Sequence, residues 1–284
     1  MRRQDLIPST AVVRSYPVVE RDCWVWLWMG DPALADPALI LAALGHHHPD
    51  WFMQTGQLAY EANYELINDN LLGLTHLSYV HEKPLGRNSM SWGESRPKVT
   101  PIERGLRIAR GVVNNPAPAY LGLSPEARID MWASYDHLVP GVFLLATQSH
   151  RPGTAAACRM EAPSAEPMWC VLTSQAVTPI SERQTVYYYS GGLSSNYATE
   201  EQSKQQIAVF EKAFAEDKAM IEAQQRILDR TRGRRMMILA TDGALNKFRR
   251  LMAELIEAEQ QIGRAGNDGR RPERLGQASR IGDS

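Results

Sequence analysis

The spacing of apolar residues divides the chain into an early pair of strands, a long run of further strands and two closing helices. Between residues 10 and 29 the segments VVRSYPVVE and CWVWLWM alternate, and the second segment puts Trp24, Trp26 and Trp28 on one face. Gly30 and the prolines of GDPALADP then end the pair. Because two strands alone are marginally stable in water, this piece must pack on other parts of the protein.

The middle of the chain has the pattern of an antiparallel sheet. The segment 51–64 is predicted as a strand, a helix is predicted to begin near Asn68 or Asp69, and a loop is predicted from about His81. Five further alternating segments, separated by Pro and Gly, then follow at 105–113, 127–137, 141–150, 168–179 and 183–192. Such a series, with turn residues between the segments, favours sequential antiparallel strands.

Two amphipathic helices are predicted after the strands. The first begins at Thr199, where Gln202 completes the sequence of a capping box. Its apolar residues recur at helical spacing at Ile207, Phe210, Phe214, Ile221 and Leu228. The second helix, from about Asp242 to Ile262, repeats the pattern at Leu245, Phe248, Met252, Leu255 and Ile262. We expect one face of each helix to pack on the sheet, which gives an α+β fold.

Composition and charge narrow the choice of partner and compartment. The 284 residues carry 31 Lys and Arg against 32 Asp and Glu, so a net charge of −1 gives no attraction to nucleic acid or to an anionic membrane. No segment approaches the roughly 20 apolar residues that span a bilayer, and no signal-peptide run follows the N-terminus. The three cysteines are far apart, as expected of reduced thiols. We therefore expect a cytoplasmic globular protein.

One carboxylate interrupts the apolar stripe of the first closing helix. Asp217 stands between Phe214 and Ile221, where the spacing calls for an apolar residue. Burying an unpaired charge costs several kcal/mol, so such an aspartate pairs with a base, accepts backbone N–H bonds or binds a metal ion. The helix pattern alone leaves these three alternatives open.

Two histidines five positions apart, His76 and His81, are candidate metal ligands. Two imidazoles and one carboxylate suit an iron(II) ion that activates oxygen. Five residues of an ideal helix turn through about 500°, which leaves the two side chains roughly 140° apart. The helix must therefore bulge or end between them if both bind one ion. Taken alone, a pair at this spacing is more often structural than ligating.

Three segments resemble one enzyme family. Residues 62–86, ANYELINDNLLGLTHLSYVHEKPLG, resemble the iron-site segment of Rieske non-haem iron oxygenases, particularly the vanillate O-demethylase type of oxygenase subunit. RSYPVVERDCWVWLWMGDPALADP at 14–37 resembles the chain leaving the Rieske domain, and AEDKAMIEAQQ at 215–225 resembles the helix that supplies the aspartate ligand. The resemblance extends from about Ile7 to Gln261.

The resemblance implies both a fold and a set of site residues. The fold is a helix-grip, or START-like, antiparallel sheet with helices, which would occupy residues 41–264. Residues 1–40 would be the remaining C-terminal strands of a Rieske-type domain, and the polar, Gly- and Arg-rich residues 265–284 a disordered tail. His76, His81 and Asp217 would bind a mononuclear iron(II), with Asn70 as a polar neighbour.

Two departures from the family pattern concern electron delivery. The sequence has no Cys-x-His and Cys-x-x-His pair, so we expect no iron–sulfur cluster on this chain. Gly73 stands at the position of the family's bridging aspartate and has no side chain with which to bridge; Asp69, one turn earlier, is a weak replacement. We expect a truncated chain, or one that takes electrons from a Rieske or ferredoxin-reductase partner, rather than a new function.

The resemblance therefore implies an iron-dependent oxygenase acting on a small aromatic substrate with O₂. The expected reaction is O-demethylation of a methoxy-aromatic compound such as vanillate, or ring hydroxylation. Family members form rings of three subunits in which each cluster serves the neighbour's iron, so the resemblance allows a homotrimer, but a chain without a cluster has lost the main reason for that arrangement. The alternative is an inactive remnant or a ligand-binding protein on the same fold.

Overall fold

A computed structural model describes residues 11–81, 90–231, 237 and 239–267. It contains a seven-stranded antiparallel sheet and, apart from it, a two-stranded hairpin. In the large sheet the strand order is β3-β9-β8-β7-β6-β5-β4. The strands are β3 Trp51–Tyr60, β4 Lys98–Ile102, β5 Gly105–Pro116, β6 Arg128–Leu138, β7 Val142–His150, β8 Trp169–Ser181 and β9 Gln184–Ser194. From β4 to β9 each strand pairs with the next strand in the sequence, and β3 pairs with β9 at the other edge, which confirms the predicted antiparallel sheet.

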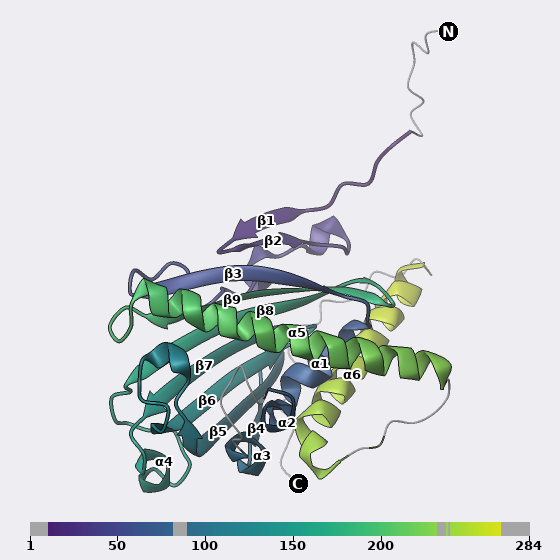
Figure 1. The fold of residues 1–284 in the computed structure, drawn as a ribbon. Coiled ribbons are helices and arrows are strands. Elements are labelled where there is room, and N and C mark those ends of the chain that lie inside the picture. The colour runs from purple at the N-terminus through teal and green to yellow at the C-terminus, as the bar shows by residue number, and fades with distance from the viewer. Residues whose placement is uncertain (1–10, 82–89, 232–236, 238, 268–284) are drawn as a thin grey trace, which may run out of the picture.

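The helices gather on one face and at one end of the sheet (Figure 1). The α-helices are α1 Tyr64–Leu72, α2 Leu77–Val80, α3 Ser91–Glu94, α4 Thr154–Ala157, α5 Glu200–Arg230 and α6 Gly243–Asn267. Short 3-10 turns are η1 Pro32–Leu34, η2 Pro37–Leu39, η3 Leu74–His76, η4 Ala119–Leu121 and η5 Ala240–Asp242. Where the chain is described, none of these helices combines the length and apolar character needed to cross a bilayer.

Helix α5 has the predicted start and the predicted packing face. Thr199 Oγ1 accepts a hydrogen bond from Gln202 N at 3.2 Å, and Gln202 Oε1 accepts one from Thr199 N at 2.9 Å. This reciprocal pair satisfies two N–H groups that the first turn leaves free. All five apolar residues of the predicted stripe belong to the main hydrophobic core or pack against it. The helix therefore lies along β9 and β3 and covers the concave side of the sheet (Figure 1).

The first helix begins earlier than its sequence pattern predicts. Strand β3 ends at Tyr60, and Asn63 caps α1 by accepting a hydrogen bond from Glu65 N at 2.9 Å. The sequence prediction of a strand through residue 64 and a helix from Asn68 or Asp69 was wrong by about one turn. An Asn at the N-cap stabilises a helix start, and this local effect outweighed the apolar alternation that continues past Tyr60.

Strand β4 was missed and helix α6 was only partly predicted. β4 forms the edge of the sheet next to β5 and contains Pro101, which is tolerated on an edge strand because its missing N–H faces no partner. In α6, Phe248 is buried in the core as expected, whereas Leu255 is 44% exposed. The expected tail falls almost wholly on residues 268–284, outside the described part of the chain.

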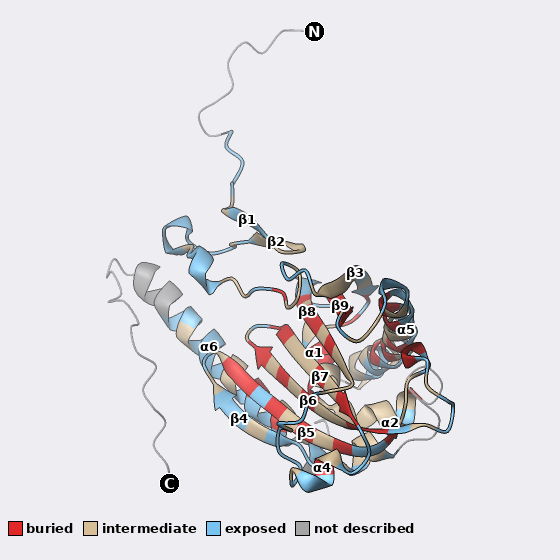
Figure 2. Ribbon diagram, turned by 90° about the vertical axis from the view of Figure 1, so that its left-hand side faces the viewer, coloured by how far each residue is buried: buried red, intermediate tan, exposed pale blue. Residues whose placement is uncertain are grey.

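The N-terminal hairpin pairs β1 Val18–Arg21 with β2 Trp24–Leu27 and stands apart from the large sheet (Figure 2). Trp24 and Trp26 lie on one face, as the alternation predicts, with their rings edge to face at 5.7 Å. Val25 and Leu27 are exposed on the other face. The first predicted strand is shorter than its sequence pattern, because only residues 18–21 pair.

Candidate metal centre

An irregular segment after α1 brings the two histidines together. Helix α1 stops at Gly73, whose backbone angles of −100° and 57° leave the helical region. The 3-10 turn η3 then ends at His76, and the short helix α2 ends at His81, itself outside the helix. The rings of His76 and His81 meet with centroids 5.4 Å apart. The helix thus breaks around the pair, as a common ligand site requires for this spacing.

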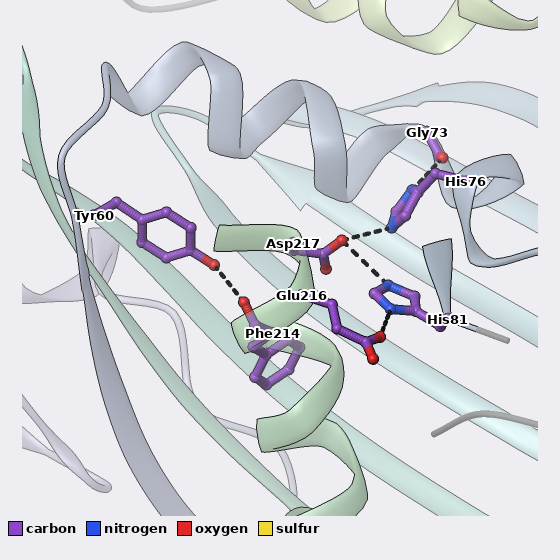
Figure 3. Close-up of polar contacts among 7 residues, drawn as sticks. All are labelled: Tyr60, Gly73, His76, His81, Phe214, Glu216 and Asp217. Atoms are coloured by element: carbon purple, nitrogen blue, oxygen red, sulfur yellow. Dashed lines mark hydrogen bonds and ion pairs between the residues drawn. The ribbon is translucent and has the colours of Figure 1, made fainter. Parts of the chain in front are cut away.

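Asp217 of α5 faces both histidines (Figure 3). Its Oδ1 atom lies 3.4 Å from His76 Nε2 and 3.2 Å from His81 Nε2. One ligand atom from each of the three residues lies within 4.8 Å of the others. Of the alternatives for this buried carboxylate, the structure therefore brings histidines to Asp217 rather than a lysine or arginine.

The three side chains converge without forming good hydrogen bonds among themselves. His81 Nε2 and Asp217 Oδ1 are buried and have no partner of hydrogen-bonding geometry in the described part of the chain. Buried polar atoms without a partner reduce the stability of the fold unless a bound ion, a water molecule or a ligand interacts with them. Atoms that carry lone pairs and point to one place fit a divalent cation, and two nitrogens with one carboxylate suit iron(II).

The outer nitrogen of each ring is fixed by a hydrogen-bond acceptor (Figure 3). His76 Nδ1 donates to the carbonyl of Gly73 at 2.7 Å, and His81 Nδ1 donates to Glu216 Oε2 at 2.9 Å. With the proton held on Nδ1, Nε2 of each ring presents its lone pair toward Asp217. The tautomer that a metal ion needs is therefore the one that these bonds favour.

Burial and charge act against each other at the centre. His81 is 1% exposed and Asp217 is 5% exposed. Burial on its own would raise the pKa of Asp217, but the neighbouring imidazoles of His76 and His81 outweigh burial and lower that pKa below its ordinary value. Asp217 is therefore the ionised, acceptor-only carboxylate that metal coordination requires.

The other two sequence candidates lie beside the three candidate ligands. Asn70 lines the same pocket as His76, His81 and Asp217. Gly73 offers only its backbone, and that carbonyl is the acceptor for His76. Asp69 does not take over the missing carboxylate, because its side chain forms an ion pair with Arg249 of α6. Sequence reasoning missed Glu216, although its place next to Asp217 was a signal that could have identified it.

A pocket of about 150 Å³ opens from the three candidate ligands between α5 and the sheet. Aromatic and aliphatic side chains dominate its wall, including Phe143, Leu145, Phe210 and Phe214. Pockets of this kind, apolar with a few convergent polar groups, are typical of small-molecule sites. The strands that form the pocket floor were predicted, but their inward-facing side chains were not singled out.

Comparison with known sequences gives one family and several relatives. A family model described as the vanillate O-demethylase oxygenase C-terminal domain matches residues 60–258. The iron-sulfur subunit of a toluene-4-sulfonate monooxygenase system from Comamonas testosteroni is 35% identical over 264 residues, covering 90% of this chain and 74% of that protein. A vanillate O-demethylase oxygenase subunit from a Pseudomonas strain is 29% identical over 259 residues, covering 88% and 71%.

Solved structures share the fold. Dicamba monooxygenase bound to 3,6-dichlorosalicylic acid superposes with a TM-score of 0.76 at 24% identity, over 89% of this chain and 73% of that one. A dicamba-bound form gives 0.74 at 23% identity, over 92% and 75%. These matches support the sheet-and-helix architecture independently of the sequence motifs.

Proposed function

The chain belongs to the vanillate O-demethylase oxygenase family and carries the catalytic domain of a Rieske-type aromatic oxygenase, and from that premise we propose that it oxygenates a small aromatic compound at an iron(II) held by His76, His81 and Asp217. The observation that carries this proposal is the convergence of the three ligand atoms at one end of an apolar pocket. We assign residues 41–264 to this catalytic unit.

Each part of the site has a role in this reaction. Bound iron would supply the one-electron chemistry that activates O₂ for insertion into a C–H bond. Gly73 and Glu216 hold the histidine rings in the required tautomer, and Asn70 offers a polar group beside them. The aromatic wall from Phe210 and Phe214 excludes water from the reacting end of the pocket and packs against a substrate ring.

The substrate we propose carries a methyl or methoxy carbon on an aromatic ring. Relatives are named for vanillate O-demethylation, dicamba O-demethylation and toluene-4-sulfonate oxygenation. A methoxy carbon attacked in this way gives a phenol and formaldehyde, and a ring methyl gives an alcohol. Methoxy-aromatics and sulfonated toluenes are therefore the two groups of compounds to offer the enzyme first.

We propose that electrons come from a Rieske cluster that these 284 residues do not carry. Cys23, Cys158 and Cys170 form no Cys-x-His or Cys-x-x-His pair in the sequence. Relatives are named as subunits or components of larger oxygenase systems, which is consistent with a separate donor. A protein that binds the aromatic without turnover is the second candidate, favoured by the absence of a side chain at Gly73.

Iron reconstitution and a single turnover test this function. The purified chain, loaded anaerobically with iron(II), should hold about one ion per chain, whereas Asp217→Ala and His81→Ala should hold almost none. His48→Ala, an exposed histidine variant, is the control and should load normally.

Chemical reduction with an aromatic present, followed by O₂, should then give product. A wild-type chain that binds no iron contradicts the proposal, and iron loading without product favours the binding protein.

A further inference from the structure

Three tyrosines from two neighbouring strands pack together behind the wall of the pocket. Tyr60 ends β3, Tyr187 and Tyr189 belong to β9, and their exposed fractions are 3%, 1% and 5%. The ring of Tyr187 lies 6.2 Å from that of Tyr60 and 5.6 Å from that of Tyr189, measured between centroids. None of the three lines the pocket. A substrate therefore does not touch them, and the oxygenase reaction proposed above gives them no role.

Phe214 lies between these tyrosines and the candidate metal centre. Figure 3 shows it on the turn of α5 that precedes Asp217, three positions later and about 4.5 Å along the helix axis. The Phe214 ring lies 5.1 Å from Tyr187 and 5.0 Å from Tyr189, and it lines the pocket together with Asp217. Electrons tunnel faster through packed rings than through open space, because atoms in contact couple the two ends. The rings therefore offer an electron a path between Asp217 and β9.

The three phenol groups differ in what can receive their proton. Tyr189 Oη donates to Glu211 Oε1 at 3.1 Å, and Glu211 is exposed on α5. Tyr187 Oη is buried and has no partner among the described residues, and Tyr60 Oη reaches only the Phe214 carbonyl, at 3.5 Å. A phenol that loses an electron becomes a strong acid, so its oxidation needs a base within hydrogen-bond reach. Of the three, Tyr189 alone meets that condition with a carboxylate.

The backbone of β3 makes room for the Tyr189 ring. Gly56 pairs with Tyr189 across the sheet, and a Cβ atom at Gly56 would overlap that ring. The ring therefore lies over β3, where its hydroxyl reaches Glu211 of α5. Burial, the charge of Glu211 and the hydrogen bond to Glu211 raise the pKa of Tyr189 to about 12. Tyr189 thus keeps its proton at neutral pH until an electron leaves the ring.

We propose that Tyr189 and Glu211 form a redox sink that reduces the oxidised iron when no aromatic substrate is bound. The oxidant that O₂ and iron form takes one electron from Tyr189 through the rings of Phe214 and Tyr187. The phenolic proton moves to Glu211, which leaves a neutral phenoxyl radical and an iron reduced by one electron. A thiolate in solution then returns an electron to the radical, and Glu211 returns the proton. The inference rests on the proposed oxygenase function for its oxidant.

The redox sink protects the wall of the pocket. Met131 lines the same cavity as the three candidate ligands, and a thioether is readily oxidised to a sulfoxide. Without a substrate ring in the pocket, this thioether is open to an oxidant formed at the iron. Transfer of the oxidising equivalent to Tyr189 moves it out of the pocket toward the exposed Glu211. Oxidation then falls on a residue that touches neither the substrate nor the metal ion.

Radical formation in the full chain tests the redox sink. The chain is loaded with iron, oxidised to iron(III) and mixed with hydrogen peroxide in the absence of any aromatic compound. This pair contains the same atoms and electrons as iron(II), O₂, one electron and two protons, so no donor protein is needed. Samples frozen within seconds are measured by electron paramagnetic resonance, with ring-deuterated tyrosine to identify a phenoxyl signal. The wild type should give the signal and Tyr189→Phe should lose it. Glu211→Gln should form it at least about tenfold more slowly, since a positioned base contributes on the order of 10²- to 10⁴-fold.

Two further variants are the controls. Tyr187→Phe keeps the ring in the path and removes a hydroxyl that has no base, and Tyr197→Phe removes a hydroxyl that donates to Glu166 before the start of α5. Both should keep the signal. Peptide mass spectrometry should show severalfold more Met131 sulfoxide in Tyr189→Phe than in the wild type or the controls. A signal that persists in Tyr189→Phe, a signal lost in either control, or equal sulfoxide in all four proteins overturns the redox sink.

These outcomes are separable from failure of the proposed function. Metal analysis before peroxide is added shows whether the chain holds iron, and a chain without iron contradicts both proposals. Iron and the Tyr189 radical without product from any aromatic compound refute the oxygenase and support the redox sink. Product without the radical overturns the redox sink alone. Circular dichroism and melting temperatures close to those of the wild type show that each variant is folded.

Discussion

The Nδ1 atom of His81 lies 2.9 Å from Oε2 of Glu216, a carboxylate that stands directly before Asp217 on the same helix. One turn of α5 therefore supplies both a proposed metal ligand and the group that orients another ligand. Glu216 is 39% exposed, so its carboxylate keeps part of its hydration while it fixes an almost fully buried ring. Such outer hydrogen bonds raise the basicity of a ligating histidine and fix its orientation.

Removing the Glu216 carboxylate should weaken metal binding without unfolding the protein. Glu216→Ala loses the hydrogen bond to His81, and we expect affinity for iron(II) to fall about 10- to 100-fold. Glu216→Gln keeps an acceptor oxygen but loses the charge, so its affinity should lie between those of Glu216→Ala and the wild type. Cobalt(II) titration followed by visible absorption measures this series. Glu259→Ala, which removes an exposed carboxylate from α6, should bind as the wild type does, and equal affinities throughout would contradict this role of Glu216.

A carboxylate at position 73 should fit the structure and improve electron delivery. A Cβ atom on Gly73 would lie 3.3 Å from the Asp69 carbonyl oxygen, a tight contact with backbone, and 3.7 Å from Leu245, while the negative φ of −100° adds no left-handed strain. Gly73→Asp should therefore fit after a backbone shift of a few tenths of an ångström and reduce the free energy of unfolding by about 1 kcal/mol.

The functional effect of that variant depends on its charge. With a separate Rieske-bearing donor protein, Gly73→Asp should raise the rate of product formation severalfold over the wild type, whereas Gly73→Asn should not. The measurement is product formed per chain with time at saturating donor. Identical rates of product formation for the wild type and both variants would contradict our assignment of Gly73 to the bridging position.

Acid should destabilise the fold through His137. This residue is fully buried, stacks on Phe248 at 3.7 Å and faces Phe143 on its other side, and burial lowers its pKa well below the ordinary 6.5. Below about pH 6.5 the unfolded chain binds a proton at His137, whereas the folded protein does not. The free energy of unfolding therefore falls by up to about 1.4 kcal/mol for each pH unit by which the pH is lowered.

Replacing His137 should remove that part of the acid sensitivity. We expect the loss of unfolding free energy between about pH 7 and about pH 5.5 to be smaller by about 1 kcal/mol in His137→Leu than in the wild type. Neither ring nitrogen of His137 has a partner in the described structure, so the leucine gives up no hydrogen bond. Urea unfolding at the two pH values gives the comparison, with exposed His48→Leu as control. Parallel pH profiles would rule His137 out as the source.

The ion pair between Asp69 and Arg249 should hold α6 against α1. Arg249 Nε donates to Asp69 Oδ1 at 3.0 Å, and the Asp69 side chain is only 15% exposed. Arg249→Met leaves that carboxylate without its partner and should reduce the free energy of unfolding by about 1 to 3 kcal/mol. The double variant with Asp69→Asn should recover part of the loss. Arg250→Met, on the exposed side of α6, is the matched control in urea unfolding.

Local patterns were enough to predict the sheet and the long helix, whereas the three candidate ligands also needed the resemblance to a family segment. The alternation of β6 to β9 and the stripe on α5 each depend on neighbours a few residues apart, which a sequence displays directly. Asp217 stood out because it broke a helical stripe, and His76 and His81 were found by their resemblance to a family segment. The site was thus predictable where a residue violated its own local pattern.

The remaining features depend on contacts that a sequence pattern does not display. The edge strand β4 contains a proline and is recognisable only beside β5. Glu216 meets His81 across 135 positions of the chain. The start of α1 depended on one capping side chain, Asn63, that competes with a continuing strand pattern.

The separation of the candidate ligands along the chain also affects how the domain unfolds. A metal ion bound by His76, His81 and Asp217 would link the segment around α2 to helix α5. The link would close a loop of well over a hundred residues. A covalent cross-link over such a loop reduces the entropy of the unfolded chain by an amount equivalent to about 4 to 5 kcal/mol. A bound ion would therefore act as a reversible cross-link. Heat or denaturant would then unfold the domain and release the metal ion in one cooperative step.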